Sequence, residues 1–107
     1  MHQYLLDLPV PSHPSAKLSR MSLSQLRYFK VVAEEGSVTR AASILHVSQP
    51  PLSRQLKALE DELGTPLFRR TARGVSLLPA GERFLAHAQA ILDKLDEAVA
   101  DVRQSRT

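Results

Sequence analysis

The chain has 107 residues, of which 14 are basic and 11 are acidic, so its formal net charge is +3. This length allows one domain with a modest core, and the absence of cysteine excludes a disulfide framework, a thiolate metal site and a cysteine nucleophile. No apolar run approaches the ~18–20 residues that span a membrane, and a mildly cationic chain is compatible with a polyanionic partner.

The first twenty residues differ in composition from the rest. They contain Pro9, Pro11 and Pro14 among several serines, and prolines at this spacing prevent a helix and disfavour a strand interior. A signal peptide is not indicated, because Asp7 interrupts the only apolar stretch. We predict a flexible arm over residues 1–20. The second methionine begins the ordered pattern, so this arm is expected to be an upstream extension or a leader.

Two short helices are predicted after the arm. Ser22 and Gln25 have the spacing of a capping box, and Gly36 provides a left-handed end for the first helix. Ser37 then caps the second helix, and His46 provides the left-handed turn that ends it. Apolar residues recur at helical spacing in both: Leu23, Leu26, Phe29 and Val32 in the first, and Val38, Ala41, Ala42 and Leu45 in the second.

A third helix is expected to begin after Ser48. Pro50 and Pro51 fall in its first turn, where a missing N–H removes no helical hydrogen bond. Gly64 and Pro66 form its stop signal. Its buried stripe consists of Leu52, Leu56, Leu59 and Leu63, and its opposite face carries Gln49, Ser53, Arg54 and Lys57.

A hairpin and a long helix complete the prediction. Two short runs, Leu67–Thr71 and Val75–Leu78, flank a three-residue loop of Ala72, Arg73 and Gly74, which is typical of a hairpin. A helix then starts at Pro79 and continues to about Gln104. Its length of about 39 Å, at ~1.5 Å per residue, is too great for it to fold fully onto so small a core. Apolar residues recur along this helix at heptad spacing and form a stripe, called the seam below. This seam predicts a dimer interface formed by Phe84, Ala88, Ile91, Leu95, Ala98 and Val102. Leu85, Leu92 and Val99 widen the seam.

The second and third helices have the spacing of a DNA-binding helix-turn-helix. Ala42 lies four residues before the turn position and suits a close helix crossing, and Leu52 lies six residues after it and points to the core. The capped start of the third helix is expected to present N–H groups and a positive dipole end to phosphate. Its outer face would meet base edges, where Gln49 suits adenine, Arg54 suits guanine and Ser53 suits a base or a phosphate.

The same residues resemble a known family. The stretch from Ser37 to Leu56, SVTRAASILHVSQPPLSRQL, is similar to the winged helix-turn-helix of LysR-type transcriptional regulators. The likeness runs from about Met21 to the end of the chain. It includes Leu59-Glu60, Leu63-Gly64, Leu67-Phe68-Arg69-Arg70 and Pro79-Ala80-Gly81. The family usually has a threonine before Pro-Ala-Gly, and Leu78 replaces it here, so the last helix lacks a side-chain cap.

The resemblance implies a mainly α fold, with a winged helix-turn-helix of three helices and a two-stranded wing over 21–78 and a dimerisation helix over 79–107. It also implies a homodimer on double-stranded DNA in the bacterial cytoplasm, associated with the nucleoid, without membrane or cofactor, and a tetramer for a full-length regulator. The family's inducer-binding domain is absent, so the chain is expected to be a fragment or a truncated product. By motif position Gln49, Pro50, Ser53 and Arg54 would contact bases or adjoining phosphates, and Arg70 and Arg73 would serve the wing. Ser48 and Lys57 complete the predicted DNA-binding set.

Other functions have weaker support. The acids Glu60, Asp61 and Glu62 fan around a helix and are expected to form a solvated face or a subunit contact, not a catalytic pair. No second ligand lies at metal spacing from His46, His87 is expected at the surface or an interface, and no catalytic motif is present, so neither a metal site nor an enzyme is predicted. The remaining alternative is a coiled-coil adaptor. It would have no use for three arginines without an acid between Leu67 and Pro79.

Overall fold

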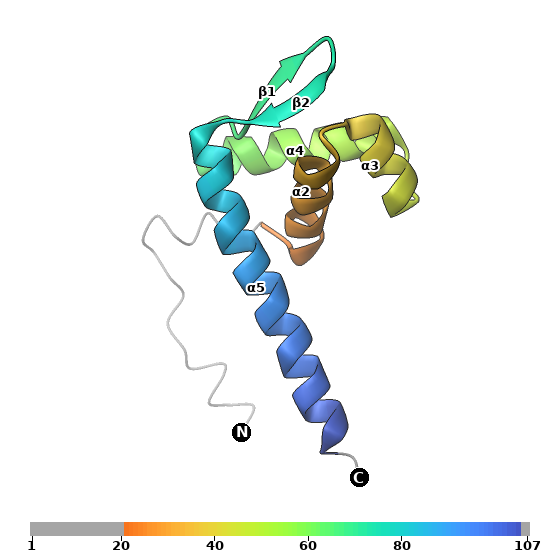
Figure 1. Ribbon diagram of the computed structural model, residues 1–107, viewed down its shortest axis with the longest axis vertical. Coiled ribbons are helices and arrows are strands. Elements are labelled where there is room, and N and C mark those ends of the chain that lie inside the picture. Colours follow the sequence, from red (N-terminus) through yellow and green to blue (C-terminus); the bar gives the residue numbers. More distant parts are fainter. Residues whose placement is uncertain (1–20, 106–107) are drawn as a thin grey trace, which may run out of the picture.

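The computed structural model describes residues 21–105, and the predicted arm over 1–20 lies outside this range. The elements run in the order α2 (Leu23–Glu35), α3 (Val38–Leu45), α4 (Gln49–Leu63), β1 (Phe68–Thr71), β2 (Gly74–Leu77) and α5 (Pro79–Gln104). The three shorter helices cluster together, the β1–β2 hairpin projects above them, and α5 extends away below (Figure 1). This is the predicted mainly helical, winged arrangement.

The ends of α2 and α3 follow from local sequence signals. The Ser22 hydroxyl accepts the N–H of Gln25 at 3.1 Å, and the Gln25 side chain accepts the N–H of Ser22 at 3.2 Å, which completes the predicted capping box. Ser37 caps α3 by accepting the N–H of Arg40 at 3.1 Å. Gly36 and His46 end the two helices in the left-handed region, with φ of 65° and 58°. Each of these ends confirms a prediction.

The start of α4 differs from its prediction. Ser48 is the N-cap residue, but its side chain makes no capping hydrogen bond. A capping side chain normally accepts from the second or third helical N–H, and here those positions are Pro50 and Pro51, which have no N–H. Gln49 is therefore the only one of the first three helical residues with an N–H. The prediction that the capped start of this helix presents several N–H groups is therefore wrong, and the exposed Ser48 hydroxyl does not cap the helix.

The core joins all the helices to the base of the hairpin. Phe29 is fully buried, and its ring lies 5.3 Å from the rings of both Phe68 and Phe84. The largest buried side chains are Phe29, Leu52, Leu56, Leu59, Leu67 and Val32. Leu63, predicted in the buried stripe of α4, is only partly buried against this core. The hairpin therefore stands on the helical core and does not form a separate unit.

The hairpin, called the wing below, has a shorter turn than predicted. Thr71 pairs with Gly74 in the antiparallel register, so the turn contains Ala72 and Arg73 alone. Gly74 has φ of 135°, and a Cβ there would lie 2.3 Å from the carbonyl oxygen of Gly36. The neighbouring Val75 N–H donates to that same oxygen at 3.0 Å. These contacts hold β2 against the turn between α2 and α3.

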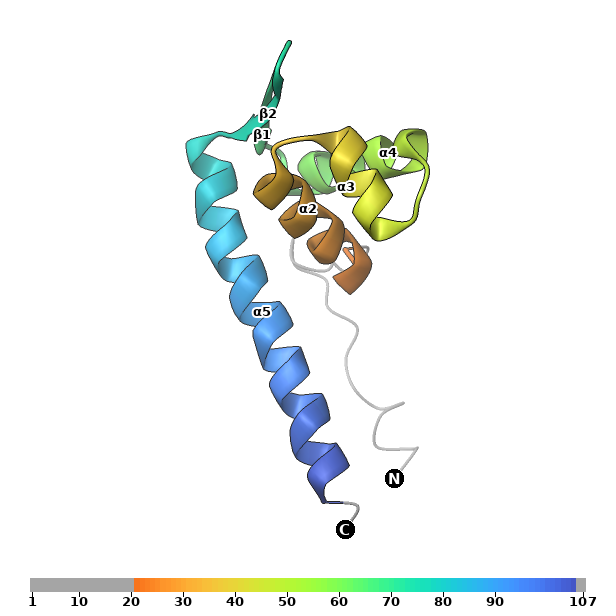
Figure 2. The same ribbon diagram turned by 45° about the vertical axis from the view of Figure 1, so that its right-hand side comes forward.

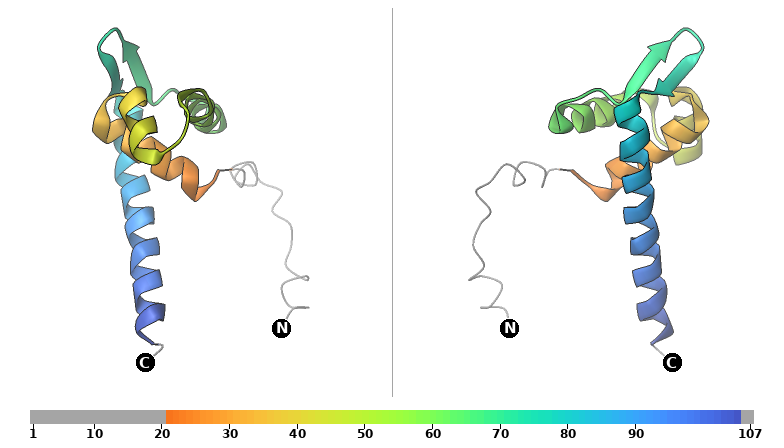
Figure 3. Two further views of the ribbon diagram at one scale, coloured as in Figure 1. Left: turned by 90° about the vertical axis from the view of Figure 1, so that its right-hand side faces the viewer. Right: turned by 60° about the vertical axis from the view of Figure 1, so that its left-hand side comes forward.

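Helix α5 belongs to the core over its first half alone. It begins at Pro79, with Leu78 as an N-cap residue that makes no side-chain bond, as predicted. Ala88 is fully buried, Leu92 is 6% exposed, and Phe84 packs against the same core. The second half extends beyond the other described elements in Figures 2 and 3. The predicted dimer seam is therefore corrected: its first two members, with Leu92, are covered by the chain's own helices.

Candidate nucleic-acid interface

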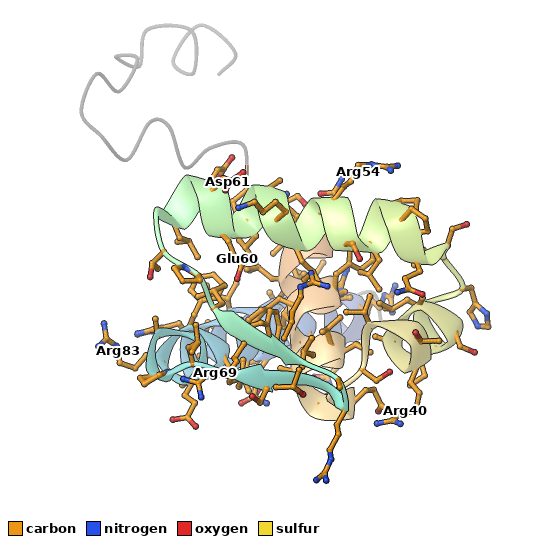
Figure 4. All side chains as sticks on the ribbon, turned by 90° about the horizontal axis from the view of Figure 1, so that it is seen from above. Arg40, Arg54, Glu60, Asp61, Arg69 and Arg83 are labelled. Carbon is orange, nitrogen blue, oxygen red and sulfur yellow. The ribbon has the colours of Figure 1, made fainter. Side chains whose placement is uncertain are left out.

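The first turns of α4 and the wing share one end of the molecule, opposite the free end of α5 (Figure 1). Figure 4 views this end from above, with α4 along one edge, the hairpin apart from it, and Arg54 directed away from the wing. Six of the eight predicted DNA-binding residues are exposed polar or charged side chains, Pro50 is exposed, and Ser53 is partly buried. The exposed six are Ser48, Gln49, Arg54, Lys57, Arg70 and Arg73.

The side chain of Gln49 is oriented by α3. The Thr39 hydroxyl donates to Oε1 of Gln49 at 3.3 Å. This leaves the Nε2 amide group of Gln49, with two donors, for another acceptor. Thr39 was not among the predicted site residues. The available signal was a polar, helix-disfavouring residue in the first turn of α3, but its contact with Gln49 spans the turn and is not visible in the sequence.

A groove connects the helix-turn-helix to the wing. It has a volume of about 190 Å³. Gln49 lies on its helical wall and Arg70 on its hairpin wall. The other lining residues are Ser37, Val38 and Thr39 from α3 and its cap, and Thr71, Gly74 and Val75 from the hairpin. Two predicted site residues from different elements thus meet at one groove.

The cationic side chains differ in how far their charge is compensated. Lys57 Nζ lies 3.2 Å from Asp61 Oδ1, with the side chains 72% and 64% exposed. Such exposed pairs contribute only about 0–1 kcal/mol. Within residues 21–105, no ion pair involves Arg54, Arg70 or Arg73. These three guanidinium groups retain their charge and their donors for an anionic partner.

The three acids of α4 occupy different environments. Asp61 is exposed, as predicted for a solvated face. Glu60 is not solvated: its Oε2 accepts the N–H of Leu67 at 2.7 Å and that of Phe68 at 3.2 Å, at the base of the wing. Glu62 is partly buried, and its Oε2 has no hydrogen-bond partner. The prediction of a solvated face or a subunit contact is therefore wrong for Glu60, whose carboxylate binds the chain's own backbone.

Other kinds of site have little support in the described part of the chain. No group of three or more histidines and acids there has a geometry that could hold a metal ion. His46 ends α3, and His87 is exposed on α5, as predicted. No helix among residues 21–105 is long and apolar enough to cross a membrane.

An apolar groove lies far from the wing. It has a volume of about 460 Å³ and is formed between the start of α2 and the middle of α5. Ile91 is 46% exposed and Val102 is 64% exposed, and both belong to the predicted seam. The groove is lined by Leu23, Ala90, Ile91, Lys94, Leu95 and Ala98. The uncovered part of the seam is thus continuous with α2.

Comparisons with known proteins agree with this architecture. Residues 23–82 match the family model described as "Bacterial regulatory helix-turn-helix protein, lysR family". The chain is 55% identical over 83 residues to the HTH-type transcriptional regulator BudR of Klebsiella aerogenes, covering 78% of this chain and 58% of that one. It is 56% identical over 72 residues to the regulator ClcR of Pseudomonas putida, covering 67% of this chain and 24% of that one.

Solved structures show the same similarity. The CbnR_DBD–DNA complex matches with a TM-score of 0.77 and 44% identity, covering 81% of this chain and 100% of that chain. The BenM_DBD/catB site 1 DNA complex matches with a TM-score of 0.79 and 42% identity, covering 81% of this chain and 98% of that chain. The chain spans about a quarter to three-fifths of the two curated relatives named above. Because residues 23–82 match the family model and the named relatives are 55–56% identical in sequence, the chain belongs to the LysR family of bacterial regulatory helix-turn-helix proteins.

Proposed function

We propose that this chain is the DNA-binding part of a LysR-type transcriptional regulator and binds double-stranded DNA as a homodimer. Helix α4 enters the major groove, and the wing lies on the flanking minor groove or backbone. The observation that carries this proposal is the groove shared by Gln49 and Arg70, which allows both elements to contact one duplex. Similarity at 42–44% identity to domains solved with DNA supports it.

Individual roles follow from chemistry and position. Gln49 has its Oε1 engaged by Thr39, so its amide N–H groups are directed to a base acceptor. Arg54 has an uncompensated guanidinium that suits the O6 and N7 acceptors of guanine. Ser53 contacts a base or phosphate beside it. Pro50 packs against a base or an adjoining phosphate. Around them, phosphate contacts come from Ser48, Lys57, Arg70 and Arg73, with Lys57 exchanging Asp61 for a phosphate.

The dimer uses the free part of α5. In a monomer, the groove beside Ile91 and Leu95 leaves apolar surface in water. Burying one leucine or isoleucine side chain contributes about 1.5–3 kcal/mol, so a second copy of α5 is the expected occupant. A two-fold dimer presents two α4 helices to one duplex and favours a pseudo-palindromic site.

The whole protein acts by binding and not by catalysis, since the relatives named above carry the names of transcriptional regulators. Contact with a bacterial chromosome places it in the cytoplasm, associated with the nucleoid. Because this chain spans only part of those relatives, an inducer domain and a tetramer belong to the longer regulator.

The test is a selection from random-sequence duplexes, followed by binding measurements from 50 to 200 mM KCl on the selected duplex and a scrambled one. A DNA-binding domain loses affinity steeply with salt, with a slope of about −0.9 for each phosphate neutralised. We expect that slope on both duplexes and tighter binding to the selected one. A coiled-coil adaptor would enrich no sequence and bind neither duplex, which would contradict the proposal.

A further inference from the structure

Glu60 connects α4 to the base of the wing through a single carboxylate oxygen. Its Oε2 accepts the N–H of Leu67 at 2.7 Å and the N–H of Phe68 at 3.2 Å. Phe68 is the first residue of β1, so these hydrogen bonds lie where the hairpin leaves the core. In Figure 4, Glu60 lies on the side of α4 that faces the hairpin, whereas Arg54 and Asp61 lie on the other side.

These hydrogen bonds are expected to be strong. Leu67 is only 1% exposed, and a buried N–H without an acceptor is costly. A carboxylate is a charge-assisted acceptor and binds an N–H more strongly than a neutral carbonyl does. The turn that precedes Leu67 contains Pro66, which has no N–H, so Leu67 and Phe68 provide the first donors of the new strand after the proline.

The hairpin amplifies any change in angle at its base. Four residue steps separate Phe68 from the turn at Ala72, which is about 13 Å at ~3.3 Å per residue. A rotation of roughly 10° at the base would move a free tip by about 2 Å. The hydrogen bond from Val75 to Gly36, close to the turn, limits this movement on β2. Binding sites require their groups to be held to about 0.5 Å. The position of Arg73, in the turn, thus depends on how firmly the base is fixed.

Two backbone contacts also hold the hairpin, one near its turn and one at its base. The N–H of Val75 in β2 donates to the Gly36 carbonyl at 3.0 Å, and Gly81 of α5 packs against the carbonyl of Leu67, where a Cβ would lie 2.2 Å away. Those two contacts are made by backbone atoms alone. Within residues 21–105, the Glu60 carboxylate provides side-chain hydrogen bonds that join α4 to the start of β1.

We infer that Glu60 is a positioning residue for DNA binding, which holds the arginines of the wing at the angle where they and α4 reach the same duplex. This inference rests on the proposed function. The charge of Glu60 alone would have the opposite effect, because a carboxylate on α4 repels phosphate. Loss of Glu60 therefore separates the two effects: a charge effect strengthens DNA binding, and loss of positioning weakens it.

The first test uses the free protein. Amide hydrogen exchange is compared for the unchanged chain, Glu60→Ala and Glu60→Gln. We expect the Leu67 and Phe68 amides to exchange at least tenfold faster in Glu60→Ala, about the effect of one lost hydrogen bond, with the amides of α2 unchanged. Glu60→Gln keeps an oxygen acceptor and is expected to restore most of the protection. Equal exchange in all three proteins would overturn the inference without any DNA measurement.

The second test uses the duplex selected by the unchanged chain, with Asp61→Ala as the matched control. Asp61 is the adjacent acid, exposed and without contact to the wing. We expect Asp61→Ala to bind slightly more tightly, Glu60→Gln within about threefold of the unchanged chain, and Glu60→Ala roughly tenfold more weakly. Thermal unfolding followed by circular dichroism verifies that each variant is folded at the temperature of the assay.

A double-mutant cycle distinguishes positioning from general destabilisation. In the unchanged chain, Arg73→Ala is expected to reduce the salt slope by about one unit. In the Glu60→Ala background the wing is already displaced, so Arg73→Ala is expected to leave the slope unchanged. Additive effects would overturn the inference while the proposed function stands. If the unchanged chain selects no duplex, the proposed function fails, and the positioning role in DNA binding fails with it.

Discussion

Among single residues, Arg54 is the side chain on which base recognition is expected to depend most. It is exposed, one turn into α4, and without an ion pair in the described part of the chain. Arg54→Ala is expected to cost about 1–3 kcal/mol on the selected duplex and much less on scrambled DNA. Fluorescence anisotropy on both duplexes measures this difference, with Arg103→Ala, at the far end of α5, as the control. Equal losses on both duplexes would show that Arg54 contacts phosphate and does not read a base.

The arginines of the wing are expected to behave differently. Arg70→Ala and Arg73→Ala should weaken binding to all sequences, and each should reduce the salt slope by about one unit for each lost phosphate contact. Both side chains are exposed in a hairpin that contains no acid. Titrations at several salt concentrations measure the slope. An unchanged slope with an altered sequence preference would mean that the wing reads groove shape, as arginines do in narrow A-tract minor grooves.

The residue-scale predictions were accurate where the signal is local. The capping box of Ser22 and Gln25 and the left-handed His46 depend on a few neighbouring positions, and both are confirmed. Ser48 was different, because its capping role depends on N–H groups that Pro50 and Pro51 remove. The contact between Thr39 and Gln49 joins two helices, and helix spacing alone does not reveal it.

At the scale of elements, the wing depends on a glycine at one close approach. Gly74→Ala would place a Cβ 2.3 Å from the Gly36 carbonyl oxygen, at φ of 135°. Gly64→Ala is the matched control, because Gly64 also has a positive φ, of 73°, but nothing lies within 4 Å of its Cβ position. We expect Gly64→Ala to cost about 1 kcal/mol and Gly74→Ala about 2–3 kcal/mol or more, from strain together with the clash.

Thermal unfolding measures the stability of both variants. In a domain of this size, each kcal/mol of destabilisation is expected to lower Tm by about 4–8 °C. Equal shifts for the two alanine variants would contradict the close packing of the wing on the turn between α2 and α3. Hydrogen exchange in β2 provides a second readout, because a displaced wing loses the bond from Val75 to Gly36.

Element boundaries were more predictable than the contacts between elements. The stop and start signals predicted α5 from Pro79 to Gln104, and the structure agrees. The wing turn was predicted one residue too long, because a glycine with positive φ fits either inside a loop or, as here, at the end of a strand. Glu60 was predicted on a solvated face or in a subunit contact, since its partners Leu67 and Phe68 follow a chain reversal that helical periodicity does not describe.

At the scale of the whole molecule, α5 is shared between the core and a proposed partner. A heptad pattern shows which side of a helix is apolar and not which chain covers it. The structure buries Ala88 and Leu92 within the chain and leaves Ile91 and Val102 exposed. The sequence therefore predicted the apolar side of α5, but Phe84 and Ala88, the first two members of the predicted seam, pack on the chain's own core.

Leu95→Asp tests the dimer directly. Leu95 lines the apolar groove beside Ile91 and Ala98, so a carboxylate there opposes association. We expect folded monomers in sedimentation velocity and weak binding to single half-sites. Ala100→Asp adds the same charge at an exposed position on the other side of α5 and is expected to remain dimeric. If Leu95→Asp stays dimeric and keeps full affinity, α5 is not the dimer interface.

Two copies of α4 are proposed to read one duplex in two separate segments of its major groove. Dimethyl sulfate protection of guanine N7, on the duplex selected by the unchanged chain, measures this most directly because N7 lies in the major groove. Two protected segments related by a dyad are expected, separated by one or two helical turns, at ~34 Å per turn. Protection in Arg54→Ala should be weakened within those segments. A selected duplex that is bound tightly but shows no major-groove protection, or protection at a single segment, would contradict the account.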